Sequence, residues 1–103
     1  MFSVMEILGK EYNLKFGLRS MFIYEQITGG VFNIQTVFDE YVYFYSCIMA
    51  DTSNPPLEFD DFINYCDEHP ELLKEFDNAL IAESKRKEML SKKDKKKVKS
   101  PKK

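Results

Sequence analysis

The sequence has no tryptophan and few of the residues that carry special chemistry or special backbone geometry. Only four glycines, four prolines, two cysteines and one histidine occur in 103 residues. So little cysteine excludes a disulfide scaffold, and so little glycine and proline excludes a collagen-like chain.

Cys47 and Cys66 match no metal-binding spacing and lie among apolar neighbours, so we expect reduced core side chains. His69 precedes Pro70, which favours a turn over a ligand role. We therefore expect no metal and no cofactor.

Long apolar runs are also missing. The longest apolar and aromatic run spans Tyr41 to Tyr45, whereas a membrane helix needs roughly 18 to 20 such residues. We therefore expect a soluble protein without membrane contact. The first residues lack the basic start and long apolar stretch of a signal peptide, which favours the cytoplasm.

No catalytic constellation can be identified. The sequence offers no pair of nucleophile and base, and its acidic pairs, such as Asp39-Glu40 and Asp60-Asp61, are adjacent in the chain. On a helix, adjacent side chains point about 100° apart and do not converge on one substrate. We expect a protein that is not an enzyme.

What the chain does contain is apolar and aromatic surface. Apolar residues make up 44% of the sequence, with nine phenylalanines and six tyrosines. This is enough for the core of one small domain. A domain of this size buries only about 60% of its unfolded surface, so a partner or self-association would add stability.

Charge divides the chain into two parts. Residues 1–84 carry four basic and fifteen acidic side chains, a formal charge of −11, whereas residues 85–103 carry eleven basic and two acidic ones, a charge of +9. Repulsion among the lysines and the lack of apolar residues predict that residues 91–103 are a disordered basic tail. Residues 1–90 are predicted to form a single globular domain.

The first part of the domain is predicted to be a β-hairpin and a helix. Tyr12, Leu14 and Phe16 alternate with polar residues after the Gly9-Lys10 turn, which is typical of a strand with one buried face. The next apolar pattern predicts a helix of about 11 residues that ends at Thr28-Gly29-Gly30 through a glycine cap.

Three more helices are predicted. Asn33 is a suitable N-cap for a central helix that carries Ile34, Phe38, Tyr41 and Tyr45 on one face, although the aromatic content of residues 41–45 also suits a strand. After a loop with two prolines, the strongest helical spacing in the chain is that of Phe59, Phe62, Ile63 and Cys66, which predicts a helix over residues 60–68. A last helix is expected to start at Pro70. The fold class is therefore α+β and mainly helical: an N-terminal hairpin, three to four helices and a disordered tail.

The segment from Gly9 to Gly30 resembles the start of the small tail assembly chaperones of long-tailed bacteriophages. In those families a hairpin written roughly as G-K-E-Y-x-L-K-F leads into a helix that ends in E-x-x-T-G-K. The matching residues here are Gly9, Lys10, Glu11, Tyr12, Leu14, Lys15, Phe16, Glu25, Thr28 and Gly29. This sequence departs from the pattern at Gly30, where a lysine is common. The match covers about 22 residues.

The resemblance implies a phage or prophage protein that binds the tape measure protein and keeps it soluble during tail assembly. It also implies possible contact with the tail tube protein, a place in the cytoplasm of the bacterial host and absence from the mature virion. Such a chaperone needs exposed aromatic surface, and the candidate partner-binding residues are Tyr24, Tyr41, Tyr43 and Tyr45. The alternative is that these tyrosines fill the core and its rim. Replacing Tyr43 by Asp is expected to impair client binding with little change in unfolding.

Two other functions stay open. The hairpin edge can pair between chains, which suits a homo-oligomer, and a small self-associating structural or adaptor protein of a phage particle is one alternative. The other is non-specific binding of nucleic acid through the basic tail. Nucleic acid is the less favoured partner, because the folded part is acidic and the tail has no aromatic residue on which bases could stack.

Overall fold

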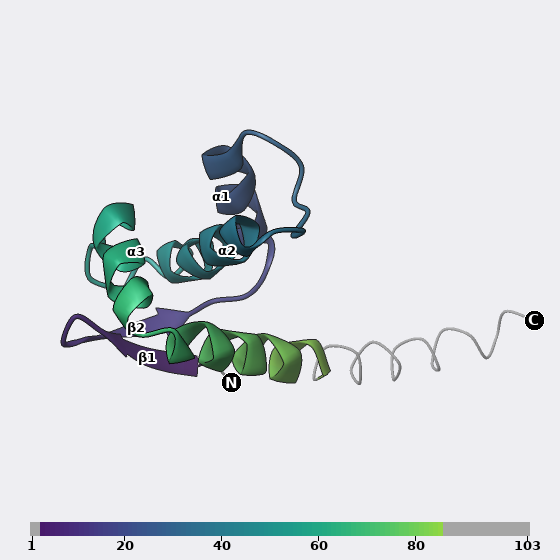
Figure 1. Cartoon of the computed structure of the whole chain (residues 1–103). Helices are drawn as coiled ribbons and strands as arrows, with labels where there is room; N and C mark the ends of the chain where they lie inside the picture. The colour runs from purple at the N-terminus through teal and green to yellow at the C-terminus, as the bar shows by residue number, and fades with distance from the viewer. Residues whose placement is uncertain (1–2, 86–103) are drawn as a thin grey trace, which may run out of the picture.

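The computed structural model of the chain describes residues 3–85. They form a two-stranded antiparallel hairpin followed by four helices, which confirms the predicted α+β, mainly helical fold. Figure 1 shows the central helix α2 in the middle of the fold, with α1 on one side and the hairpin on the other. The predicted domain boundary near residue 90 and the predicted disorder of residues 91–103 lie outside the described residues.

The hairpin consists of β1 (Ser3–Ile7) and β2 (Lys10–Leu14). Its register pairs Ser3 with Leu14 at one end and Ile7 with Lys10 at the other. Leu8 and Gly9 form the turn with φ values of 54° and 76°, the double left-handed geometry that matches the twist of the strands. One face of the hairpin is buried in the core through Met5, Ile7, Tyr12 and Leu14. The predicted alternation of buried and exposed residues is thus confirmed.

The helix α1 spans Leu18–Thr28, the 11 residues that the sequence predicts. It starts where the Ser20 hydroxyl donates to the Gly17 carbonyl at 2.8 Å. It ends at Gly29, whose left-handed backbone (φ 76°) lets its N–H donate to the Glu25 carbonyl at 2.8 Å. Glycine adopts this conformation without the steric cost that a Cβ brings, so the predicted glycine cap is confirmed.

The helix α2 spans Val37–Met49, so residues 41–45 are helical and not a strand. The predicted N-cap, Asn33, is wrong. The helix starts after Thr36, whose hydroxyl accepts a bond from the Asp39 N–H at 3.1 Å while the Asp39 carboxylate accepts from the Thr36 N–H at 3.1 Å. This reciprocal capping box satisfies two otherwise unpaired N–H groups, an arrangement that Asn33 does not offer. Consequently Ile34 precedes the helix instead of lying on its face.

The remaining residues close the core from the other side. The helix α3 spans Phe59–Glu68, one residue longer than predicted. A further helix covers residues 71–85 and follows Pro70, as predicted; Figure 1 shows it in green beside the hairpin. Its Phe76 is fully buried and stacks on the Phe44 ring of α2 at a centroid distance of 4.6 Å. The core therefore lies around α2, where all elements contribute apolar side chains.

Candidate partner-binding surface

The four predicted partner-binding tyrosines lie at different depths. Tyr24 and Tyr43 are only 2% and 6% exposed, whereas Tyr41 and Tyr45 are half-buried. The expectation that Tyr24 and Tyr43 offer exposed aromatic surface is therefore wrong. Their positions on α1 and α2 face the interior because these two helices pack against each other. Tyr24 and Tyr43 are core residues, which is the alternative that the sequence left open.

Tyr24 holds the loop after α1 in place. Its hydroxyl donates to the Asn33 carbonyl at 2.8 Å, and its ring packs edge-on against Phe32 at 5.0 Å. Burial raises the pKa of Tyr24, and the nearby Asp39 carboxylate raises it further because an anion disfavours a second negative charge. The residue thus connects α1, the loop and the start of α2.

Tyr43 and Tyr45 serve two other contacts of α2. The Tyr43 ring packs edge-on against Phe32 and Phe76, and burial raises its pKa. The Tyr45 hydroxyl donates to the Leu57 carbonyl at 2.6 Å, and its ring packs against Phe59 at 5.1 Å. Tyr45 therefore fixes the loop before α3 and keeps only part of its ring available to a partner.

Tyr41 lies on α2 and is half-buried. Its pKa is raised first by burial and then by interaction with Cys66, Glu40, Asp67 and Asp77. Together with Tyr45 it forms the part of the predicted set that remains half-exposed.

The largest exposed apolar side chains belong to a different set, which sequence reasoning missed. Leu18 is 67% exposed, Phe22 57% and Val31 81%. We define the outer apolar surface as the six such residues on α1, the following loop and the start of α2: Leu18, Phe22, Ile27, Val31, Val37 and Phe38. Apart from these six, only Val4, Leu8 and Ile81 are large, apolar and exposed among the described residues. Scattered apolar residues are normal on a protein surface, but six within 21 consecutive positions are a concentration along the chain. Within α1, Leu18 and Phe22 share one face, whereas Ile27 lies about 140° further round the helix than Phe22.

The apolar residues of α1 do not by themselves indicate which face of this helix is exposed. In α1, Leu18 and Phe22 are four residues apart and so share a face, while Ser20 and Tyr24 share another. The buried face contains the serine, and the exposed face contains the phenylalanine. A hydroxyl at a core position and an aromatic ring at a surface position reverse the usual preference, so the apolar residues of α1 do not identify its exposed face.

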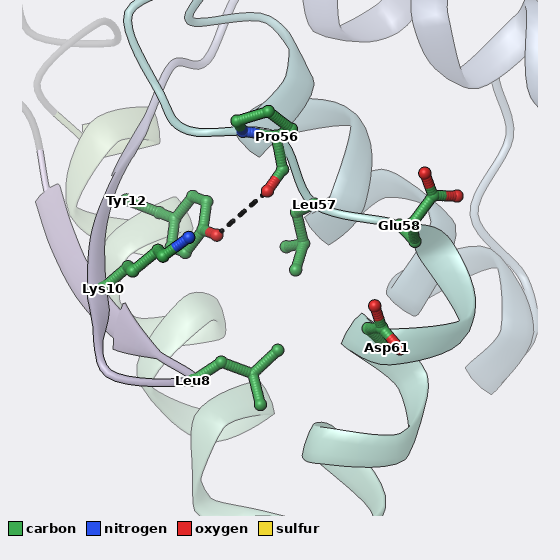
Figure 2. A pocket seen from close by; sticks show the side chains of 7 residues that line it. All are labelled: Leu8, Lys10, Tyr12, Pro56, Leu57, Glu58 and Asp61. Atoms are coloured by element: carbon green, nitrogen blue, oxygen red, sulfur yellow. Dashed lines mark hydrogen bonds between the residues drawn. The ribbon is translucent and has the colours of Figure 1, made fainter.

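A separate cleft of about 210 Å³ lies between the hairpin turn and the start of α3. Figure 2 shows Leu8 and Lys10 on the hairpin side, with Glu58 and Asp61 across from them. The Tyr12 hydroxyl donates to the Pro56 carbonyl at 3.4 Å on its wall. The cleft joins apolar walls to charges of both signs and is open on one side, so it suits a single side chain better than a cofactor.

The residues with special chemistry have structural roles. Cys47 and Cys66 are buried and form no disulfide with each other, and burial raises the pKa of the Cys66 thiol to about 11. This confirms the prediction of reduced core thiols. His69 is the C-cap of α3, where its ring stacks on Tyr65 at 4.0 Å and its Nδ1 lies 2.9 Å from the Tyr65 carbonyl. Among residues 3–85 there is no cluster of His, Cys, Asp and Glu suited to a metal ion.

The described residues also include no helix that is both long and apolar enough to cross a bilayer. Comparison with known proteins gives no match of this chain to a family model, to a curated protein or to a solved structure.

Proposed function

We propose that this chain is a non-enzymatic tail assembly chaperone of a bacteriophage or prophage, which binds the tape measure protein and keeps it soluble while the tail tube protein assembles around it. The observation that carries the proposal is the outer apolar surface. A chaperone for a long apolar helix needs apolar side chains that folding has not consumed, and the α1–α2 segment supplies them.

The local structure of the family-like segment supports the same proposal. Its residues form a hairpin, a helix and a left-handed glycine cap in the order that the phage chaperone pattern implies. The match extends only over this segment, so it supports the proposal together with the surface and not by itself.

The net charge of the described residues bears on which client the outer apolar surface can bind. Residues 3–85 carry five basic and fifteen acidic side chains, so the part of the chain that carries the outer apolar surface has a net negative charge. This negative charge opposes non-specific aggregation, and it favours a client helix with basic residues beside its apolar stripe. Nucleic acid is disfavoured as a partner of the described residues for the same reason.

The test is co-expression with the tape measure protein encoded in the same tail gene cluster. The soluble fraction of that client is measured with the wild-type chain, with the double variant Phe22→Glu, Phe38→Glu, and with a control double variant Gln26→Glu, Asn64→Glu. Both pairs add two negative charges at exposed positions, but only the first removes apolar surface.

We expect the wild-type chain and the control variant to keep the client soluble and to co-purify with it, and the Phe22, Phe38 variant to do neither. Failure of the wild-type chain to bind the client overturns the proposal. Equal activity of both double variants places the client site elsewhere on the chain. Recovery of this chain from purified phage particles favours the structural or adaptor alternative, because a chaperone is absent from them.

A further inference from the structure

The two edges of the hairpin differ in their hydrogen bonding. In an antiparallel pair, residues that face each other alternate between hydrogen-bonded and non-hydrogen-bonded pairs, and members of the second kind direct their backbone groups outward. The Asn13 N–H donates to the Asn54 side chain at 2.7 Å, and the Asn13 carbonyl accepts from it at 2.9 Å. Both groups of Asn13 therefore point away from β1, which makes the Val4–Asn13 pair non-hydrogen-bonded.

The outer edge of β2 is closed by these bonds. Asn54 also donates to the Ile48 carbonyl at 2.7 Å, so one side chain connects β2 to the end of α2. Just beyond the strand, the Lys15 N–H donates to the Cys47 carbonyl at 3.0 Å. No additional strand can pair with this part of β2 without breaking those contacts.

The outer edge of β1 is open. By the same alternation, Val4 and Glu6 direct their N–H and carbonyl groups away from β2. Within residues 3–85 nothing forms a hydrogen bond with these groups. The Val4 side chain is 50% exposed and the Glu6 side chain is exposed, both on the face that does not enter the core. An open strand edge of this kind is a template for pairing with another chain.

We infer that β1 pairs with β1 of a second copy, antiparallel and about a two-fold axis at Met5, to form a four-stranded sheet across a homodimer. In this register Val4 of each copy faces Glu6 of the second copy, and every outward N–H and carbonyl of these two residues acquires a partner. The inference does not depend on the proposed chaperone function.

Charge selects this register over its neighbour. Glu6 already faces Glu11 across the hairpin, a like-charge pair on the exposed face. Facing Glu6 with Glu6 of the second copy would place four glutamates in one row across the sheet. The register with Val4 opposite Glu6 adds no new pair of facing like charges. On the core side, the same register places Met5 beside Met5 of the second copy, which extends an apolar row.

The number of open edges sets the size of the assembly. Pairing two copies through β1 uses the open edge of both. On each β2 edge Asn54 occupies the outward groups of Asn13, which leaves those of Glu11 alone and too few for a further strand to pair. The sheet therefore stops at four strands and the assembly at a dimer, in contrast to an edge-to-edge filament or ring.

The first test uses backbone amide hydrogen exchange by NMR, together with light scattering, over a range of protein concentrations. We expect the Val4 and Glu6 amides to exchange rapidly in dilute monomer and to become protected as the dimer forms, with the Asn13 amide protected throughout. A dimer in which these two amides stay unprotected overturns the inference, as does a chain that remains monomeric at millimolar concentration. Protection that is independent of concentration also overturns it, because another part of the same chain then covers the edge.

The second test is the variant Val4→Pro with Val4→Thr as its control. Proline removes an N–H that makes no bond in the monomer, and it is tolerated at strand edges, so the monomer is expected to fold. Loss of one bond from each copy is expected to weaken the dimer at least about tenfold. The threonine variant keeps the N–H and the dimer. Equal dissociation constants for the two variants contradict the inference.

Discussion

The α1–α2 pair has an inner and an outer side that differ in how their aromatic residues are used. On the inner side, the Tyr24 hydroxyl bonds to Asn33, and the Tyr43 ring is enclosed by other rings. On the outer side, Phe22 and Phe38 leave more than half of their surface in water. The hairpin shows the same division, with a β2 edge bonded to Asn54 and an open β1 edge. In both regions, side chains or backbone groups on one side form contacts within the fold, and those on the other side are exposed.

The largest expected effect on the free energy of unfolding comes from introducing an aspartate on the inner side of the α1–α2 pair and, for comparison, on the outer side. Tyr43→Asp is expected to lower the free energy of unfolding by at least about 3 kcal/mol, because it removes a buried ring and buries an unpaired carboxylate. Phe22→Asp is expected to change it by less than about 0.5 kcal/mol, since the ring is exposed. Urea unfolding of both variants checks this pair. Similar losses for the two variants would remove the distinction between the inner and outer sides. The expectation from the sequence that Tyr43→Asp impairs client binding with little change in unfolding is thus revised.

The closed edge of the hairpin supplies the next prediction. Asn54→Ala removes three hydrogen bonds that join β2 to α2 and is expected to cost about 2 kcal/mol of unfolding free energy. Asn64→Ala, the same change at an exposed position of α3, is expected to be nearly neutral. Thermal and urea unfolding of the two variants provide the measurement. A neutral Asn54 variant would mean that water replaces the bridge without loss, and the two edges would then be equivalent.

The start of α2 tests the boundary between the inner helix and the outer loop. Thr36→Ala removes the hydroxyl that accepts from the Asp39 N–H and is expected to cost about 1 kcal/mol. Asn33→Ala leaves the Asn33 carbonyl bond to Tyr24 in place and is expected to cost much less. Helical circular dichroism and urea unfolding distinguish the two. A larger loss at Asn33 would restore the helix start that the sequence alone predicts.

These cases separate what the sequence could predict from what it could not. The glycine cap after α1 and the helix over residues 59–68 follow from local chemistry, because a left-handed glycine and a clear apolar spacing act over a few residues. The buried face of α2 cannot be predicted from local chemistry, because apolar residues occupy almost the whole circumference of this helix. Which of its sides is covered depends on the elements that pack against it. The Asn54 bridge joins residues 41 positions apart, beyond the reach of any local pattern.

The free energy of unfolding at acid pH is expected to depend on the carboxylate of Asp39. The N–H of Gln35 is the largest cause that lowers the pKa of Asp39 below its ordinary value of 3.8, with the N–H of Thr36 next in the same direction. A lowered pKa in the folded state gives a contribution that is present above the unfolded pKa and is lost as pH falls through the folded one. Asp39→Asn should therefore be less stable than wild type at about pH 6, with the difference shrinking toward about pH 2.5. A constant difference across this range would show that the carboxylate charge is not involved. The effect is expected to be smaller than that of Thr36→Ala, since the carboxylate is exposed to solvent.

The smallest expected effect lies at the turn that joins the open and the closed edge. Leu8 has a left-handed backbone (φ 54°), which is unfavourable for a bulky side chain, whereas Asn tolerates it and Asn-Gly is the preferred pair for such a turn. Leu8→Asn is expected to raise the free energy of unfolding by roughly 0.5 kcal/mol. Val31→Asn makes a comparable change at an exposed position without a left-handed backbone and is expected to have no such gain.

Because the turn fixes the register that leaves Val4 and Glu6 facing outward, the Leu8 variant should keep the amide exchange pattern of wild type. A destabilised Leu8 variant would mean that the leucine contacts across the cleft in Figure 2 outweigh the backbone strain, and the turn would then belong to the folded side of the molecule.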